Sequence, residues 1–132
     1  MKIPTEGIVC DGAHSEKYKL TQFQAVDLAT GEILFRKDIG YQTTNIGEYL
    51  GLVESIKHVI FNVRKPTDIY CDSLTAIKWV EEKYTASNKN NADVFKAEMF
   101  VLFLQNKINE LVTIHHWNTK EWGENPADFG NK

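Results

Sequence analysis

Apolar and polar residues at the start of the chain follow extended patterns. Ile8-Val9-Cys10 is a short, unbroken apolar run that ends in Asp11-Gly12, which predicts a strand buried on both faces. Two longer extended segments, about 20–28 and 33–41, flank the polar, glycine-containing stretch 29–32. This pattern is typical of an antiparallel hairpin, so we expect three successive strands in the first third of the chain.

After the third strand, the spacing of apolar residues changes to that of a helix. One apolar face runs from Ile46 to about Asn62, and Pro66 prevents the helix from continuing. A second short apolar run, Ile69-Tyr70-Cys71, ends in Asp72-Ser73 and leads into a helical pattern at about 74–83. We therefore expect a helix, a strand and a second helix in the middle of the chain.

The last third of the chain predicts a loop, a long helix and a strand. Polar residues from 85 to 91 indicate the loop, and the helix of about Asp93 to Asn109 is apolar nearly all round, so it should be covered on two sides. A strand at 111–117 and a loop with one helical turn at 118–132 follow. The order β-β-β-α-β-α-α-β implies an α/β (α+β) domain with a mixed sheet covered by helices.

Composition narrows the class of protein. A chain of 132 residues that is 42% hydrophobic and 25% charged, without repeats or linkers, fits a single domain over residues 1–132. Cys10 and Cys71 lie inside apolar runs, which indicates buried thiols and a reducing compartment. No segment has the pattern of a signal peptide or a membrane span, so we expect a cytoplasmic protein with no membrane partner.

The net charge and one apolar helix indicate which partners to expect, nucleic acid or a second copy of the chain. The net charge of −3 provides no basic footprint, which by itself argues weakly against a nucleic-acid partner. The apolar helix at 93–109, which includes Phe100 and Phe103, should offer a patch to a second copy of the chain. We therefore expect a weak homodimer through this helix.

A short sequence pattern that occurs twice gives the first indication of a functional site. Ile8 to Gly12 and Ile69 to Ser73 have the same form: a short buried strand, a cysteine, an aspartate and then a small residue. If the two strands are parallel neighbours, Asp11 and Asp72 meet at their carboxyl ends, where open sheets bind ligands. Two close carboxylates repel each other unless a cation or a shared proton compensates.

Each acidic residue also has a purely structural interpretation. Either aspartate could end its strand as a turn former or a helix cap. Asn45-Ile46-Gly47-Glu48 has the form of a capping box, with Asn45 as the N-cap and Glu48 reaching back to it. Asp128 could be a solvated residue near the end of the sequence. For Glu48, spacing alone favours the helix cap, whereas for the aspartates both interpretations stay open.

Histidine and tryptophan residues add no second site. His115 and His116 are adjacent on a predicted strand and point to opposite faces, so we expect one to be packed and the other exposed. The cysteines and histidines lack the spacing of a structural zinc site. We expect Trp117 and Trp122 to be packing residues.

Four motifs together resemble a known family. They are Cys10-Asp11-Gly12, Thr43-Thr44-Asn45-Ile46-Gly47-Glu48, Cys71-Asp72-Ser73 and Asn125-Pro126-Ala127-Asp128. In order and spacing this set resembles the type 1 ribonuclease H family, and the stretch from Trp122 to Gly130 resembles its bacterial, Bacteroides-like form. The resemblance implies a five-stranded mixed sheet of order 3-2-1-4-5 flanked by helices, and an endonuclease that hydrolyses the RNA strand of RNA–DNA hybrids.

The resemblance also implies a metal site. Asp11, Glu48, Asp72 and Asp128 would hold two Mg²⁺ ions, for which Mn²⁺ could substitute, and the products would be a 5′-phosphate and a 3′-hydroxyl. Asp11 would contact both ions. Asp72 and Glu48 would hold the ion on the leaving-group side, and Asp128 the other ion.

The resemblance assigns substrate contacts near these carboxylates. The residues expected to bind the hybrid are Gly12, His14, Thr43, Thr44, Asn45 and Ser73. Ala13-His14-Ser15-Glu16 stands where the family often has a glycine-rich turn, and the loop at 85–91 is too short for a basic protrusion. The family's mobile loop histidine has no counterpart, and Glu124 or Lys120 are the candidates to assist in its place.

Two other functions remain compatible with the residues. One is a nuclease of the same fold that acts on DNA, since one fold hosts many functions. The other is a non-catalytic nucleic-acid-binding module. A complete set of carboxylates favours the hybrid nuclease, because clustered negative charge opposes the binding of phosphates unless metal ions are present.

Overall fold

The computed structural model describes residues 3–85 and 91–129, and its centre is a mixed β-sheet. The strands are β1 (Ile8–Ser15), β2 (Leu20–Asp27), β3 (Ile33–Asp38), β4 (Thr67–Cys71) and β5 (Val112–His116). Their order is β3-β2-β1-β4-β5. Strands β1 to β3 pair antiparallel, whereas β4 pairs parallel to both β1 and β5. The expected five-stranded sheet and its order are confirmed.

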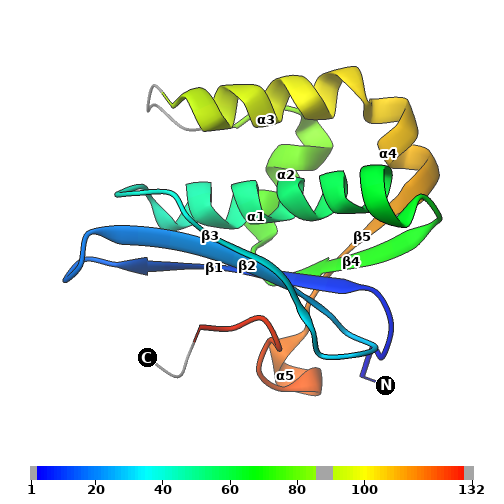
Figure 1. Cartoon of the computed structure of the whole chain (residues 1–132), viewed down its shortest axis with the longest axis horizontal. Helices are drawn as coiled ribbons and strands as arrows, with labels where there is room; N and C mark the ends of the chain where they lie inside the picture. Colours follow the sequence, from blue (N-terminus) through cyan, green and yellow to red (C-terminus); the bar gives the residue numbers. More distant parts are fainter. Residues whose placement is uncertain (1–2, 86–90, 130–132) are drawn as a thin grey trace.

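Helices cover the two faces of the sheet unequally. The helices are α1 (Thr44–His58), the π-helical turn η1 (Val59–Val63), α2 (Leu74–Glu82), α3 (Ala92–Phe103), α4 (Gln105–Leu111) and α5 (Thr119–Trp122). Helix α1 lies along one face, and α3 forms an outer layer above it (Figure 1). The short helix α5 and the C-terminal segment lie on the opposite side. No helix among residues 3–85 and 91–129 is long and apolar enough to cross a membrane.

Two clusters of buried side chains match these two faces. The larger cluster fills the space between the sheet and helices α1 to α4 and includes both cysteines, which are buried free thiols as expected. The smaller cluster, which contains Val9, Val26, Trp117 and Ala127, attaches the C-terminal segment to the opposite face. Trp117 and the half-buried Trp122 pack edge to face in this layer, which confirms their expected packing role.

The first hairpin is longer than expected. The stretch Ala13-His14-Ser15-Glu16 does not replace a turn, because β1 continues through Ser15 and residues 12–15 pair with residues 20–23 of β2. The chain reverses between the strands, and Lys19 adopts a left-handed φ of 50° there. Regular pairing with β2 thus extends the strand beyond Asp11.

The predicted helix at 93–109 is divided in two. Leu104 leaves helical geometry with φ −107° and ψ 18°, so α3 ends before it and α4 begins after it. The expectation of cover on two sides is wrong, because α3 packs against α1 with one face only. On its outer face Phe95 is 60% and Phe103 is 77% exposed. The weak homodimer stays a prediction, and most of the loop expected at 85–91 lies outside the described residues.

The two adjacent histidines of β5 have different surroundings. The His115 ring stacks on Tyr70 with a centroid distance of 4.8 Å, and its Nε2 lies 2.9 Å from an Asp68 carboxylate oxygen. His116 is exposed. The His115 side chain is still 38% exposed, so the expected division into a packed and an exposed histidine is confirmed only in part.

Candidate active site

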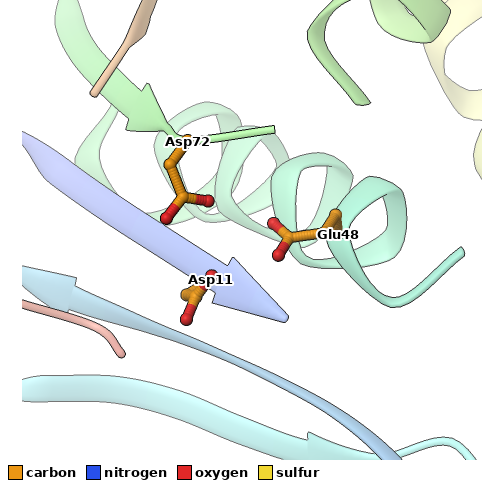
Figure 2. Close-up of side chains that lie close together, drawn as sticks. All are labelled: Asp11, Glu48 and Asp72. Atoms are coloured by element: carbon orange, nitrogen blue, oxygen red, sulfur yellow. The ribbon is translucent and has the colours of Figure 1, made fainter. Parts of the chain in front are cut away.

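Two aspartates meet where parallel strands β1 and β4 carry them to one end of the sheet. Cys10 pairs in register with Cys71, so Asp11 and Asp72 follow the same step of two neighbouring strands. One ligand atom from each aspartate and one from Glu48 all lie within 4.8 Å of one another. Figure 2 shows the three carboxylates converging from β1, from the end of β4 and from α1. The predicted meeting of the two aspartates is confirmed.

Glu48 reaches this cluster because β1 and the start of α1 lie unusually close. A Cβ atom on Gly12 would lie 2.8 Å from the backbone nitrogen of Glu48, closer than a side chain tolerates. Gly12 therefore sets the separation between the strand and the helix that carries the third carboxylate.

The start of α1 differs from the predicted capping box. Thr43, and not Asn45, is the N-cap, and its hydroxyl accepts a hydrogen bond of 3.2 Å from the N–H of Ile46. Asn45 lies in the first turn and is exposed. The helix begins earlier than the pattern indicated, so Glu48 is turned toward the sheet and does not cap the helix.

Burial and mutual repulsion change the acidity of these carboxylates. Removal from water, followed by repulsion from Glu48 and Asp72, raises the pKa of Asp11 from 3.8 to about 9. Removal from water and repulsion from Cys71 and Asp72 raise the pKa of Glu48 from 4.5 to about 8. A hydrogen bond between the two side chains further raises the pKa of Asp11 and partly offsets the rise at Glu48.

The cluster suits a divalent cation. Glu48 Oε2 is buried and has no hydrogen-bond partner, which is costly unless something positive binds there. Within residues 3–85 and 91–129, no lysine, arginine or histidine forms an ion pair with Asp11, Glu48 or Asp72. A set of carboxylate oxygens without a protein cation fits the preference of Mg²⁺ and Mn²⁺ for oxygen ligands.

The fourth predicted carboxylate lies beside this cluster but outside its 4.8 Å limit. Asp128 is half-buried, and its charge contributes to the raised pKa of Asp11. It belongs to the segment that follows α5, where its N–H bonds to the carbonyl of Asn125 at 2.9 Å. Glu124 is exposed, and a hydrogen bond to Asp128 raises its pKa. Asp128 thus lies near Asp11 without belonging to a strand or a helix.

Solved structures with a similar fold are known, whereas no protein-family model matches the chain. The N-terminal ribonuclease H domain of a Mycobacterium tuberculosis protein matches with a TM-score of 0.58 and 16% identity, over 83% of this chain and 80% of that one. Ribonuclease H1 from Halobacterium salinarum matches with a TM-score of 0.56 and 18% identity, over 91% and 90% of the two chains. The foamy viral protease-reverse transcriptase in complex with an RNA/DNA hybrid matches at 0.63 and 16% identity, over 97% of this chain and 20% of the viral one.

The chain has a ribonuclease H fold. In this ribonuclease H fold, two of the residues predicted to contact substrate are helix N-caps. Ser73 is the N-cap of α2, and its hydroxyl accepts a hydrogen bond of 3.1 Å from the N–H of Ala76. Thr43 has the same role for α1, so their predicted contacts with substrate stay predictions beside a demonstrated structural role. Thr44 and Asn45 are exposed at the start of α1 and are open to a ligand.

Three further residues were predicted to act at the site: His14, Lys120 and Glu124. His14 is half-buried, and its ring nitrogens lie 2.9 Å from the Thr21 hydroxyl and 2.9 Å from a Glu16 carboxylate oxygen. It is therefore held within the hairpin of β1 and β2. Lys120 is exposed on α5, and the proposed assisting role of Lys120 or Glu124 stays a prediction.

Two buried amides in this region were not predicted. Asn125 Nδ2 donates to the Cys10 carbonyl at 3.2 Å and to Asp72 Oδ2 at 3.3 Å, while Gln24 Nε2 donates to the Ala127 carbonyl at 2.6 Å. Both side chains are 5% exposed. Asn125 belongs to the C-terminal motif, but its partners lie far away in the sequence, and Gln24 has the local pattern of an ordinary strand residue.

Proposed function

We propose that the protein is a divalent-metal-dependent nuclease that hydrolyses the RNA strand of RNA–DNA hybrids and leaves a 5′-phosphate and a 3′-hydroxyl. The observation that carries the proposal is the convergence of Asp11, Glu48 and Asp72, with one buried oxygen of Glu48 unpaired, within a ribonuclease H fold. A resident site for Mg²⁺ explains why three mutually repelling carboxylates are retained together.

The proposed roles of the residues follow from where their oxygens lie. Asp11, Glu48 and Asp72 would bind one ion, and Asp11 with the neighbouring Asp128 would bind a second. Bound Mg²⁺ or Mn²⁺ would supply positive charge for the phosphoryl oxygens and lower the pKa of water. The rigid strand ends and the start of α1 would hold the carboxylate oxygens in place, which lowers the reorganisation needed during reaction.

The proposed substrate rests on the open surface at the start of α1 and on two similar structures. Thr44 and Asn45 are exposed beside Glu48, and an amide there can both donate to and accept from a ribose 2′-hydroxyl, the group that distinguishes RNA from DNA. Solved structures of LC11-RNase H1, at 15% identity and a TM-score of 0.54, and of the foamy viral enzyme each contain an RNA/DNA hybrid.

A cleavage assay with four substrates tests the proposal. We would incubate the protein with end-labelled RNA–DNA hybrid, duplex RNA, duplex DNA and single strands, each with Mg²⁺, with Mn²⁺ and with chelator. We expect cleavage of the RNA strand of the hybrid alone, and only with metal. Cleavage of duplex DNA would instead indicate a DNA-directed nuclease, and cleavage in chelator would exclude the metal site.

A further inference from the structure

Asp128 lies on a segment that lacks regular secondary structure. Residues 123–129 follow the short helix α5, and neither strand pairing nor a helical ladder fixes them. A carboxylate that binds metal must be held in place to within a fraction of an ångström. The position of Asp128 must therefore depend on the side chains that contact this segment.

A row of three side chains crosses the sheet beneath the segment. Asp11 on β1 pairs in register with Gln24 on β2, and Gln24 pairs with Arg36 on β3. Cross-strand partners lie on the same face of a sheet, so all three side chains are on the side that faces the C-terminal segment. The row begins at the central carboxylate of the candidate active site.

Two members of this row contact the residues on either side of Asp128. Gln24 Nε2 donates a hydrogen bond of 2.6 Å to the carbonyl of Ala127. The Arg36 guanidinium lies over the Phe129 ring, 4.6 Å from its centroid. The residues before and after Asp128 are thus each bound to a neighbouring strand, and Asp128 lines one hollow of the surface together with Gln24 and Arg36.

A glutamine at position 24 lowers the stability of the buried layer between the sheet and the C-terminal segment. It is 5% exposed, and its Oε1 is buried without a hydrogen-bond partner among the described residues. An unpaired buried acceptor is destabilising, and an apolar side chain of the same size would avoid it. The hydrogen bond from Nε2 to Ala127 is the interaction that an apolar side chain could not make. This points to a role in placing the segment and not in packing the sheet.

We propose that Gln24 is a positioning residue that holds Asp128 beside Asp11, where the two carboxylates together would hold a second divalent ion. The proposal rests on the proposed function, since it concerns the same site. It extends the active site to β2, and through Arg36 to β3. Ala127 is also held through its N–H, which donates to Asn125 Oδ1 at 2.7 Å, but only Gln24 binds its carbonyl to β2. Without the Gln24 hydrogen bond, the peptide that leads into Asp128 loses its bond to β2, and the distance from Asp128 to Asp11 is less well fixed.

The test compares Gln24→Met with a matched control on the same strand. Gln22 precedes Gln24 by two residues, and its Nε2 donates to the exposed Asp38 at 2.6 Å. For each variant we would measure Mn²⁺ affinity by calorimetry, kcat and KM on the hybrid, and the thermal midpoint in chelator. For Gln24→Met we expect Mn²⁺ affinity and kcat to fall about 10- to 100-fold, as for residues that orient metal ligands, with KM and thermal midpoint little changed. Gln22→Met should resemble the wild type.

A double variant separates positioning from a general structural effect. If Gln24 acts through Asp128, adding Gln24→Met to Asp128→Asn should cause no further loss of Mn²⁺ affinity, because the carboxylate that it positions is already absent. Equal, multiplying losses in both backgrounds would overturn the proposal, as would wild-type Mn²⁺ affinity in Gln24→Met. A wild-type protein that neither binds Mn²⁺ nor cleaves the hybrid would instead contradict the proposed function, so the two failures are distinguishable.

Discussion

The carboxylates of the candidate site are held in two different ways. Asp11, Glu48 and Asp72 are attached to β1, to α1 and to the end of β4, so backbone hydrogen bonds fix where their Cα atoms lie. Asp128 is attached to an irregular segment that side chains of Gln24, Asn125 and Arg36 bind to the sheet. The first group depends on the fold as a whole, whereas Asp128 depends on a few contacts that substitutions can remove one at a time.

Because the two groups of carboxylates are held differently, substitutions around them should have different effects on the stability of the protein and on its activity. Changes to the backbone that positions the first group should alter both the packing of the fold and the reaction, because the same strand pairing and helix placement serve both, whereas removal of one of its carboxylates should alter the reaction alone. Changes to the side-chain contacts of the C-terminal segment should alter the reaction while the sheet remains intact. The predictions that follow test this separation, from the largest expected effect to the smallest.

Removal of one backbone-held carboxylate should abolish activity without unfolding the protein. We expect Asp72→Asn to lower kcat by at least about 1,000-fold, equivalent to about 4 kcal/mol, because a metal ligand is lost. Without metal, the variant should be as stable as the wild type or more stable by roughly 1 kcal/mol, since repulsion with Asp11 and Glu48 is relieved. Urea midpoints in chelator and hybrid cleavage in Mg²⁺ measure the two effects.

The control for this prediction lies on the same strand. Asp68 is near the start of β4 and contacts His115, and an asparagine there can keep that hydrogen bond. Asp68→Asn should therefore leave cleavage unchanged. An active Asp72→Asn protein would end the metal-site interpretation.

A methyl group on Gly12 should disturb the carboxylates through the backbone. The added Cβ would lie 2.8 Å from the backbone nitrogen of Glu48, so Gly12→Ala must push α1 away from β1. A displacement of about 1 Å at reacting groups can lower a rate by about 100-fold. We expect kcat to fall by that order and the thermal midpoint to fall as well, in contrast to Gln24→Met. An unchanged midpoint with reduced activity would show that the two regions do not differ in this way.

Several of these relations could be predicted from the sequence, and others could not. The recurrence of strand, cysteine and aspartate predicted that Asp11 and Asp72 meet, because it depends only on two buried strands being parallel neighbours. The place of Glu48 came from the family resemblance, since spacing alone favoured a helix cap. The true cap, Thr43, lies two residues before Asn45, which the pattern indicated, and local propensity determines helix boundaries only to within one or two residues.

The contacts of the C-terminal segment could not be predicted from the sequence around each residue. Gln24 and Ala127 are separated by 103 residues and Asn125 and Cys10 by 115, so only the folded chain shows that they are partners. The exposed outer face of α3 was mispredicted for a related reason. Its apolar residues indicated burial, but whether an outer layer covers them depends on the rest of the fold.

Stability without metal should fall as the pH rises. Asp11 and Glu48 keep their protons in the folded state up to about pH 9 and pH 8, whereas the unfolded chain loses them near 3.8 and 4.5. The folded state therefore binds more protons between these limits, and its stability, complete at low pH, is lost as the pH rises from about 4 to about 9. We expect urea midpoints in chelator to decrease between about pH 5 and about pH 9.

Metal should reverse this trend, because cations displace the protons of Asp11 and Glu48 and bind more tightly as the pH rises. The Asp72→Asn variant should show a weaker pH dependence in chelator, since Asp72 contributes to the raised pKa of both groups. A midpoint in chelator that increases with pH would contradict the raised pKa values of Asp11 and Glu48.

The smallest expected effect separates helix capping from substrate binding at the start of α1. Thr43→Ala removes the N-cap hydroxyl and should cost about 1 kcal/mol of stability, with a small effect on KM. Asn45→Ala should leave the urea midpoint unchanged and raise KM for the hybrid, because Asn45 is exposed and does not cap the helix. A loss of stability in Asn45→Ala equal to that of Thr43→Ala would favour a structural role for both.

The distant partners of the C-terminal segment also have a consequence for the order of folding. Closing a loop of about 100 residues costs more chain entropy than forming a hairpin, and contacts between distant residues form late. The pairing of β1, β2 and β3 is local, so we expect the sheet to form before Gln24 and Asn125 engage the segment. A refolding molecule would therefore acquire its three backbone-held carboxylates first and Asp128 last, and would remain unable to cleave nucleic acid until the rest of the domain had folded.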